Sequence, residues 1–285
     1  MIIDGKKITE ELLAELKKLP KPEKFLAAVL VGNDLASVSF LKQKEKVAHE
    51  LGVDFRTYRR PTSIHQDELR KEVLKVAKHK TCGGVLVQLP LPAHIDRQYV
   101  LNAIPREKDV DVLGERALGA FYAGRNPVLP PAVGVVQRII ANCLPAGDPV
   151  KRDKLQIANC HAVVIGRGLL IGRPVAQWLI GEVAELTVFN STTQNLRERL
   201  KDADLIVSGV GKAGLFSAED VKDDAVVIDF GYARDADGKI HGDFTSPLSV
   251  VGCKLLAYTP TPGGTGPILV AQLFQNFFTL VALQK

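Results

Sequence analysis

The feature that most limits the possible folds of this chain is the alternation of short apolar runs with amphipathic segments. Apolar runs occur at FLAAVLVG (25–32), GGVLVQLP (83–90) and HAVVIG (161–166), and segments with helical spacing of apolar residues separate such runs. Short, continuous apolar runs are typical of strands that are buried on both faces of a parallel sheet. Strands that alternate with helices form βαβ units. The sequence therefore predicts an α/β protein.

The predicted elements fall into two groups, one on each side of a proline-rich region at 123–150. Prolines rarely occupy helix interiors or central strands, so we expect the domain boundary in this region, which also holds one helical stretch, AVGVVQRIIANCL. Thr9 is a plausible cap for the first helix. In chain order, helices are predicted at 6–18, from Ala36 or Ser37 to 51, 66–80, 173–182 and 268–284, and strands at 25–32, 54–60, 83–90, 161–166, 185–190, 203–211 and 224–231.

Composition narrows the class of protein. The 285 residues are 46% hydrophobic and 24% charged, with a net charge of +5 that is too mild for a nucleic-acid interface but suits a small anionic ligand. The four cysteines are far apart and form no C-x-x-C pair, and the six histidines form no ligand cluster, so we expect free thiols and no metal site. The N-terminus lacks a signal-peptide pattern and no run reaches the ~20 apolar residues of a membrane helix, so we expect a cytoplasmic protein.

One lysine stands where a helix should face the core. In FLKQKEKVAHEL (40–51) the apolar residues recur at helical spacing, and Lys44 lies near the middle of their stripe, four residues after Phe40. Two interpretations are open. The amine could reach solvent while its alkyl stem covers the core, or it could point into a cleft, where desolvation would lower its pKa and fit it for proton transfer.

A glycine-rich turn opens the second half. VVIGRGLLIGRP (163–174) follows a predicted strand and precedes a predicted helix, and it places Gly166, Gly168 and Gly172 in the pattern G-x-G-x-x-x-G. Such a turn lets the backbone approach a pyrophosphate at a helix N-terminus. The spacing is one residue longer than the usual dinucleotide pattern, so an ordinary strand-to-helix turn is the alternative.

The residues around this turn favour NADP over NAD. The next strand ends in FNSTT and carries no acidic residue that would bind a ribose 2′-hydroxyl. Arg167, with Ser191, Thr192 and Thr193, would instead accept a 2′-phosphate. A solvated surface arginine is the alternative for Arg167.

Taken together, these motifs resemble the bifunctional methylenetetrahydrofolate dehydrogenase/cyclohydrolases. VGNDLAS, GGVLVQLPLP, PREKDVD, VVIGRG-x3-GRP and TPTPGGTGP occur in that family's order and at its spacings along nearly the whole chain. The resemblance implies two α/β domains with a cleft between them, the second a Rossmann-like NAD(P)-binding domain. Because the family's last helix packs on the first domain, it implies a folate-binding catalytic domain of 1–131 plus 263–285 and a nucleotide-binding domain of 132–262.

The implied activity is NADP-dependent oxidation of 5,10-methylenetetrahydrofolate, followed by hydrolysis of the methenyl product to 10-formyltetrahydrofolate, in a homodimer. The implied catalytic residues are Lys44, Gln88 and Asp111. These three are also expected to bind the reduced folate, together with Phe40, Leu89, Pro90, Pro262, Gly263 and Gly264. The residues expected to bind NADP are Gly166, Arg167, Gly168, Gly172, Arg173, Pro174, Ser191, Thr192, Gly209 and Gly211.

The chain departs from the family pattern at five places. It has Phe40 for tyrosine, Gly168 for serine, Pro130 for threonine, Val112 for glycine and Thr265 for valine. Phe40 can stack on the p-aminobenzoyl ring of a folate but cannot hydrogen-bond to Lys44. We therefore expect the dehydrogenase reaction to persist and the hydrolytic reaction to be weakened.

Other interpretations stay open at this stage. The departures are compatible with a non-catalytic paralogue that binds folate or nucleotide without turnover, and another two-domain dehydrogenase, of the shikimate type, ranks below it. Without the family pattern, Asp109 and Asp111 would be taken for a solvated acidic turn, and Gln88 for a cap at a strand end.

Overall fold

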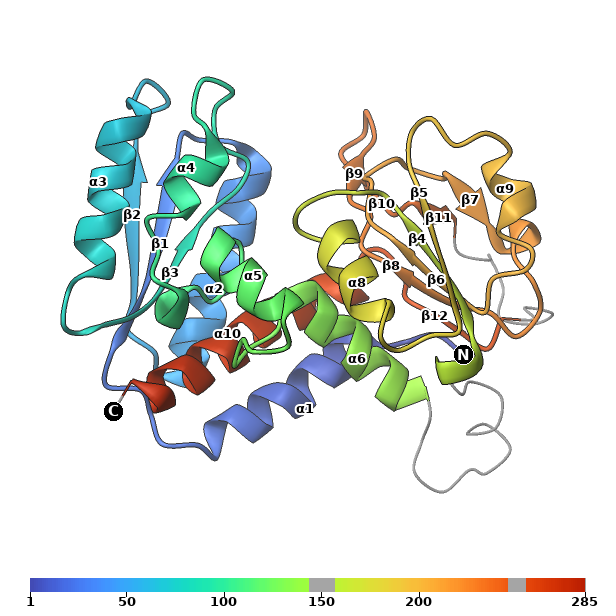
Figure 1. Ribbon diagram of the computed structural model, residues 1–285, viewed down its shortest axis with the longest axis horizontal. Helices are drawn as coiled ribbons and strands as arrows, with labels where there is room; N and C mark the ends of the chain where they lie inside the picture. The colour runs from blue at the N-terminus through green and yellow to red at the C-terminus, as the bar shows by residue number, and fades with distance from the viewer. Residues whose placement is uncertain (144–156, 246–254, 285) are drawn as a thin grey trace. The chain divides into compact units, whose positions relative to one another are not determined.

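The computed structural model describes residues 1–143, 157–245 and 255–284, which divide into two compact units. The lysine unit consists of Glu10–Pro131 and Val270–Lys285, and the glycine-turn unit consists of Met1–Thr9 and Ala132–Leu269. Each unit contains a parallel sheet with helices against it (Figure 1). The predicted α/β class with two parallel-sheet parts is confirmed.

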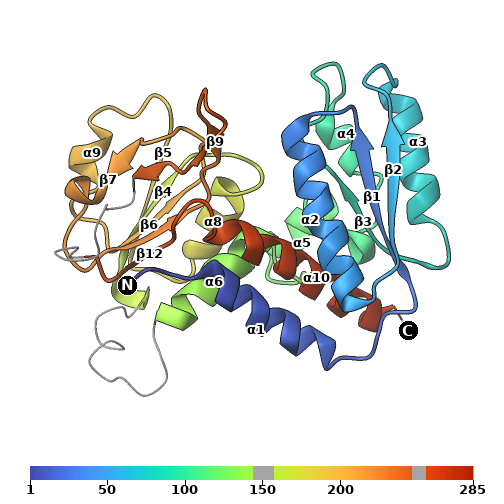
Figure 2. The same cartoon turned by 180° about the vertical axis from the view of Figure 1, so that it is seen from behind.

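The lysine unit is built on a three-stranded parallel sheet in the order β2-β1-β3. Every residue of β1 (Phe25–Val31) and β3 (Cys82–Val87) is buried, whereas β2 (Phe55–Arg60) lies at the edge and is partly exposed. The connecting helices are α2 (Leu35–Leu51) and α3 (Gln66–Ala77), and α2 lies in front of the sheet in Figure 2. The shorter elements of this unit are α4 (Arg97–Leu101), η1 (Arg106–Lys108) and α5 (Glu115–Tyr122).

Helices α1 (Gly5–Lys17) and α10 (Thr265–Leu283) each have several residues in both units. The first begins after Asp4, whose carboxylate accepts hydrogen bonds from the backbone N–H groups of Lys6 and Lys7. The predicted cap at Thr9 is wrong, because this residue lies within the helix and its hydroxyl donates to the Gly5 carbonyl at 2.7 Å. A threonine in a helix can bond to the carbonyl one turn earlier, so its presence does not mark a helix end.

The other, α10 (Thr265–Leu283), is apolar around most of its circumference, which is typical of a helix that is buried. Its phenylalanines Phe274 and Phe277 pack in the core of the lysine unit with Leu12 and Leu26. By length and composition alone α10 could cross a membrane, but 56% of its most apolar window is buried inside the structure. A core helix meets the same criteria, so this similarity is weak evidence for a membrane span.

The glycine-turn unit contains a five-stranded sheet in the order β12-β8-β6-β4-β5, and all of its pairings are parallel. Helix α8 (Gly172–Leu179) packs on β4 and β5. The strands are β4 (His161–Ile165), β5 (Glu185–Phe189), β6 (Leu205–Ser208), β8 (Val226–Asp229) and β12 (Ala257–Tyr258). The remaining elements are α6 (Pro131–Cys143), η2 (Ile157–Asn159), α9 (Leu196–Arg199), β7 (Phe216–Ser217), η3 (Ala218–Asp220), β9 (Ala233–Arg234), β10 (Ile240–His241) and β11 (Phe244–Thr245).

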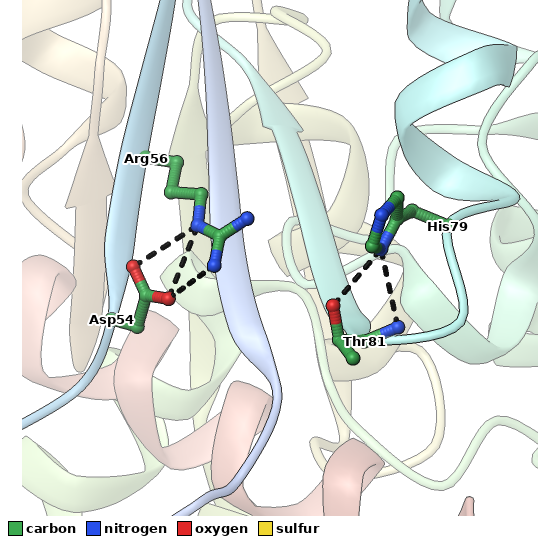
Figure 3. A network of polar contacts seen from close by, with 4 residues as sticks. All are labelled: Asp54, Arg56, His79 and Thr81. Atoms are coloured by element: carbon green, nitrogen blue, oxygen red, sulfur yellow. Dashed lines mark hydrogen bonds and ion pairs between the residues drawn. The ribbon is translucent and has the colours of Figure 1, made fainter.

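Two separate pairs of residues make polar contacts near the amino ends of strands in the lysine unit (Figure 3). Just before β2, Asp54 accepts hydrogen bonds from the Arg56 guanidinium, which lies 4.0 Å from the centroid of the Phe25 ring. On the way into β3, the His79 ring contacts Thr81 and lies 5.6 Å from the same Phe25 ring. In parallel α/β sheets, ligands bind at the opposite, carboxyl ends of the strands. The carboxyl ends of the strands are therefore the expected place for a ligand.

Candidate active site

Lys44 is buried in the lysine unit. Helix α2 begins after Asp34, whose side chain accepts a hydrogen bond from the Ser37 backbone N–H at 2.8 Å. Lys44 then lies on the buried face between Leu41 and Ala48, and it is only 5% exposed. Its neighbours Lys42 and Lys46 on the same helix are exposed. The interpretation in which the Lys44 amine reaches solvent is excluded.

The amine of Lys44 is held by Gln88. Gln88 follows the last residue of β3, and its Oε1 accepts a hydrogen bond from Lys44 Nζ at 3.0 Å. The Gln88 Nε2 donates to the Leu89 carbonyl at 2.9 Å, which leaves Oε1 turned toward the lysine. Leu89 itself is half-buried, and Pro90 is exposed. The carboxyl end of a buried strand thus fixes the position of the amine.

Two aspartates lie in the turn that follows η1, and they do not form a solvated acidic turn. Asp109 is 1% exposed, and its Oδ2 accepts hydrogen bonds from the backbone N–H groups of Leu113 at 3.0 Å and Gly114 at 2.8 Å. The pKa of Asp109 is raised to about 7, chiefly by burial and also by the charge of Asp111, while the backbone hydrogen bonds oppose the rise. The interpretation as a solvated acidic turn, which the residues alone favoured, is wrong. The stretch K-D-V-D gives no indication that its turn is buried.

Asp111 and Lys44 form a buried electrostatic pair. Burial lowers the pKa of Lys44, and the negative charge of Asp111 partly opposes that change. Burial likewise raises the pKa of the half-buried Asp111, and the charge of Lys44 partly opposes it. Each group stabilises the charged form of the other, while removal from water favours both neutral forms. Coupled, desolvated groups of this kind are typical of residues that transfer protons.

Phe40 completes this group of residues. Its half-buried ring lies one helical turn before Lys44, and the Lys44 amine is 5.1 Å from the ring centroid. The face of an aromatic ring attracts a cation but accepts no proton from it. The structure thus brings four of the predicted residues together in the lysine unit: Phe40, Lys44, Gln88 and Asp111. The arrangement can bind a polar planar molecule and transfer protons to or from it.

The glycine turn has the geometry of a phosphate-binding loop. Gly166 has φ of 107°, and a methyl group added at Gly172 would lie 2.1 Å from the Gly166 carbonyl oxygen. Both positions therefore require glycine. Space is open around Gly168, and the turn leads directly into α8. Free backbone N–H groups at the start of a helix attract an anion, so these residues fit the pyrophosphate of a dinucleotide.

A surface hollow of about 620 Å³ adjoins this turn. Arg167, Arg173 and Val188 are among the residues that line it, and the Arg173 Nε donates to the Arg167 carbonyl at 3.0 Å. Ser191 and Thr192 follow β5 and are exposed, and the Thr192 backbone N–H donates to the Asn190 side chain at 2.8 Å. The hollow and its two arginines can accept a negatively charged group, and the exposed hydroxyls supply hydrogen bonds.

The other predicted cofactor residues also belong to the glycine-turn unit. Gly209 and Gly211 follow β6, and a methyl group added at Gly166 would lie 2.7 Å from Val210 between them. Pro174 is buried in the first turn of α8. The structure therefore brings the segment after β6 against the glycine turn.

The loop before α10 forms a third group of predicted residues. Pro262 and Gly263 are exposed and Gly264 is buried, and all three belong to the glycine-turn unit. Thr265, which replaces the family's valine, donates from its hydroxyl to the Asp229 carbonyl at 2.8 Å. Three of the residues predicted to bind folate therefore lie in a different unit from Lys44.

Sequence reasoning missed a second buried acid pair, Asp229 and Asp243. Asp229 is 1% exposed and is the last residue of β8. Asp243 is fully buried and accepts a hydrogen bond from Ser208, the last residue of β6. The available signal was an acid at the end of a fully apolar run in DAVVIDFG. Such an acid is rarely buried without hydrogen-bond partners.

Comparison with protein families matches both parts of the chain to one family. Residues 3–111 match the catalytic domain of tetrahydrofolate dehydrogenase/cyclohydrolase, and residues 143–285 match the NAD(P)-binding domain. Among characterised relatives, the chain is 37% identical to the bifunctional protein FolD of Lactococcus lactis subsp. cremoris over 283 residues, covering 96% of this chain and 94% of the relative. It is also 37% identical to the FolD protein of Campylobacter concisus, covering 99% and 97%.

Solved structures give the same result. The crystal structure of the bifunctional FolD enzyme from Campylobacter jejuni superposes with a TM-score of 0.88 at 30% identity, covering 100% of this chain and 99% of that one. The Trypanosoma brucei enzyme, which was crystallised with NADP and an inhibitor, also gives 0.88, at 28% identity and with coverage of 100% and 98%.

Proposed function

Since this chain belongs to the tetrahydrofolate dehydrogenase/cyclohydrolase family, we propose that it oxidises 5,10-methylenetetrahydrofolate with NADP⁺ and hydrolyses the methenyl product to 10-formyltetrahydrofolate. The observation that carries the proposal is the buried amine of Lys44, 3.0 Å from Gln88 Oε1 and electrostatically coupled to Asp111. A desolvated lysine coupled to an acid is an arrangement that shifts pKa values toward those useful for proton transfer. Both proposed reactions interconvert one-carbon forms of tetrahydrofolate, so the protein acts in one-carbon folate metabolism.

In the oxidation, the protein mainly aligns two molecules. NADP⁺ supplies the hydride acceptor when it is bound at the glycine turn. Asp111 binds the amino edge of the pterin, and Phe40 stacks on the p-aminobenzoyl ring. Gln88 holds Lys44 in a fixed orientation through its side-chain amide. Correct positioning of two reactants can account for much of an enzyme's rate enhancement.

In the hydrolysis, Lys44 moves protons. A water molecule attacks the carbon that bridges the two folate nitrogens, and the neutral amine of Lys44 takes one proton from it. The bond from this carbon to one nitrogen then breaks, that nitrogen takes up a proton, and one proton is released overall. General acid–base catalysis of this kind is typically worth about 10²–10⁴-fold in rate. Burial lowers the pKa of Lys44, which increases its neutral fraction.

Phe40 limits the second reaction. The ring lies beside the Lys44 amine at 5.1 Å but offers neither a hydrogen-bond acceptor nor a proton. The attraction of the ring for a cation favours the ammonium form of Lys44, which cannot act as a base. Hydrolysis is therefore weakened, while the oxidation persists.

The resemblance also supports a division of the chain into two domains and an expectation about the protein's location, oligomeric state and partners. From the resemblance we infer a folate-binding domain of residues 1–131 with 263–285 and a nucleotide-binding domain of residues 132–262. The two compact units differ from this division at residues 1–9 and 263–269. The protein is a cytoplasmic homodimer that acts on a small-molecule substrate and has no nucleic-acid or membrane partner. Light scattering on the purified protein measures its oligomeric state.

The purified protein tests the activity directly. With 5,10-methylenetetrahydrofolate and NADP⁺, the absorbance of NADPH should rise, and the rate should be higher than with NAD⁺ at equal concentration. Hydrolysis is followed separately from the loss of methenyltetrahydrofolate absorbance. Binding of both ligands without NADPH formation would instead identify a non-catalytic paralogue.

A further inference from the structure

We propose that Asp243 is a positioning residue for the cofactor, because it holds the segment that follows β6 against the glycine turn. The inference rests on the proposed function, since it concerns the same dinucleotide site. Asp243 is not among the residues that the sequence predicts for this site. It would act through the backbone of the segment 209–212, here called the β6 loop.

Three hydrogen bonds, one from the end of β6 and two from the β6 loop, join this part of the chain to one carboxylate. Asp243 Oδ2 accepts from the Ser208 hydroxyl at 2.6 Å and from the Val210 backbone N–H at 2.8 Å. Its Oδ1 accepts from the Lys212 backbone N–H at 2.7 Å. These bonds bracket Gly209 and Gly211, and bonds to an ionised acceptor are stronger than bonds between neutral groups. The carboxylate therefore fixes the backbone on both sides of each of these two glycines.

The loop in turn contacts the glycine turn. A methyl group added at Gly209 would lie 2.7 Å from Cγ2 of Ile171, and one added at Gly166 would lie 2.7 Å from Cγ1 of Val210. A displacement of the β6 loop by about one ångström would therefore also move the residues expected to bind the pyrophosphate. This contact links Asp243 to the site without Asp243 touching a ligand.

Asp243 is itself tightly enclosed. It is fully buried, and a methyl group added at Gly231 would lie 2.4 Å from its Oδ1. The neighbouring Asp229 is fixed by the backbone N–H groups of Gly231 at 2.6 Å and Phe244 at 3.0 Å. The carbonyl of Asp229 also accepts a hydrogen bond from Thr265 at the start of α10. The described partners of these two acids are backbone N–H groups and hydroxyls, which is the environment of a support rather than of a proton carrier.

The test compares Asp243→Asn with a matched variant at the other end of the same strand. Asp204 precedes β6 and accepts a hydrogen bond from the His161 backbone N–H at 2.8 Å. An Asp204→Asn variant therefore also removes the charge of an acid that binds backbone, but it lies away from the cofactor. We expect Asp243→Asn to raise KM for NADP⁺ by about tenfold or more, because an amide group replaces an ionised acceptor opposite backbone donors. KM for the folate should stay within about twofold, and Asp204→Asn should leave both KM values unchanged.

Ser208→Ala provides a second variant, which removes one of the three donors and leaves the carboxylate. It should raise KM for NADP⁺ by about threefold to tenfold, since it loses a single charge-assisted hydrogen bond. If Asp243→Asn does not fold, this variant decides the outcome. An Asp243→Glu variant that restores part of the affinity for NADP⁺ would add support.

The outcomes separate the inference from the function it rests on. If the wild-type protein forms no NADPH, the proposed function fails. If the wild-type protein is active and Asp243→Asn and Ser208→Ala keep its KM for NADP⁺ while the melting temperature falls, Asp243 is only a stabilising residue and the inference is overturned. A rise in KM for NADP⁺ in proteins with wild-type circular dichroism supports it.

Discussion

Each unit of this protein buries a pair of aspartates, but the two pairs face different partners. In the lysine unit, Asp111 interacts electrostatically with the amine of Lys44, and Asp109 interacts with Asp111. In the glycine-turn unit, Asp229 and Asp243 face backbone N–H groups and the Ser208 hydroxyl. One member of each pair, Asp109 or Asp229, has its pKa raised to about 7, chiefly by burial.

The comparison shows that a perturbed pKa alone does not identify a catalytic group. Burial and a second nearby carboxylate raise the pKa in both places, yet only the first pair has a partner that can exchange a proton with it. In the second pair the same burial accompanies a set of hydrogen bonds that fixes two loops. The role of each acid is therefore inferred from the group that it contacts, and the raised pKa alone is not sufficient.

The largest effect is expected from Lys44→Met, which removes the amine and keeps the length of the side chain. The hydrolysis rate should fall by about 10²–10⁴-fold, because no other base among the grouped residues is neutral and oriented by Gln88. Loss of methenyltetrahydrofolate absorbance measures it. Lys46→Met, on the exposed side of the same helix, is the control and should keep the wild-type rate. An unaffected rate in Lys44→Met would remove the lysine from the mechanism and with it the distinction between the two pairs.

The next effect concerns stability as a function of pH. Asp109 and Asp229 each have an ordinary pKa of 3.8 and a pKa of about 7 in the folded protein. Between these values the folded protein holds a proton that the unfolded chain releases, so the free energy of unfolding falls as the pH rises through this range. With about 1.4 kcal/mol for each unit of pKa, each acid contributes on the order of a few kcal/mol.

Urea unfolding at pH 5 and pH 8 measures this effect. Asp109→Asn and Asp229→Asn should each lose less stability than the wild-type protein between the two pH values. Only Asp109→Asn should also alter the pH profile of hydrolysis, because Asp109 interacts electrostatically with Asp111, which is coupled to Lys44. A changed hydrolysis profile in Asp229→Asn would show that the two pairs do not differ in the way proposed.

A smaller effect is expected from Phe40→Tyr. The new hydroxyl would be placed near the Lys44 amine, which is 5.1 Å from the centre of the ring, and it could accept a hydrogen bond or relay a proton. One added hydrogen bond of ordinary strength corresponds to about fivefold in rate, so hydrolysis should rise by about this factor while NADPH formation changes little. Phe40→Leu is the control: it removes the ring, and it should weaken folate binding without any gain in hydrolysis. No rise in hydrolysis with Phe40→Tyr would count against a limiting role for Phe40.

Sequence reasoning reached the fold because its signals are local. The fully apolar runs that became β1, β3, β4 and β6 are buried on both faces, and the glycine turn lies between β4 and α8 as predicted. Lys44 stood out because a charged residue occupied the apolar stripe of a helix. The short elements, such as α4 and β9, have too few residues to show a periodic pattern.

The acid pairs could not be predicted in the same way. Asp229 and Asp243 are fourteen positions apart in the sequence, and the paired strands β9 and β10 lie between them in the chain. The burial of Asp109 depends on the backbone N–H groups of Leu113 and Gly114, which no side-chain pattern reveals. The roles given to Gln88 and Asp111 rested on resemblance, and they stay predictions until the variants are measured.

The smallest effect separates the two pairs by their backbones. Glycines lie close to the second pair, whereas Val112 follows Asp111 with φ of 56° and is fully buried. A β-branched residue in the left-handed region is strained, and an alanine there is strained as well. Glycine relieves the strain but loses about 0.5–1 kcal/mol through the entropy of the unfolded chain. Val112→Gly should therefore be at least as stable as Val112→Ala, although both lose the packing of the side chain.

At Val110, which is equally buried but has no positive φ, the glycine variant should be less stable than the alanine variant by about 0.5–1 kcal/mol. Urea unfolding of the four variants measures these differences. The same order at both positions would show that Val112 stores no strain and that the turn presenting Asp111 is as relaxed as the loops around Asp229.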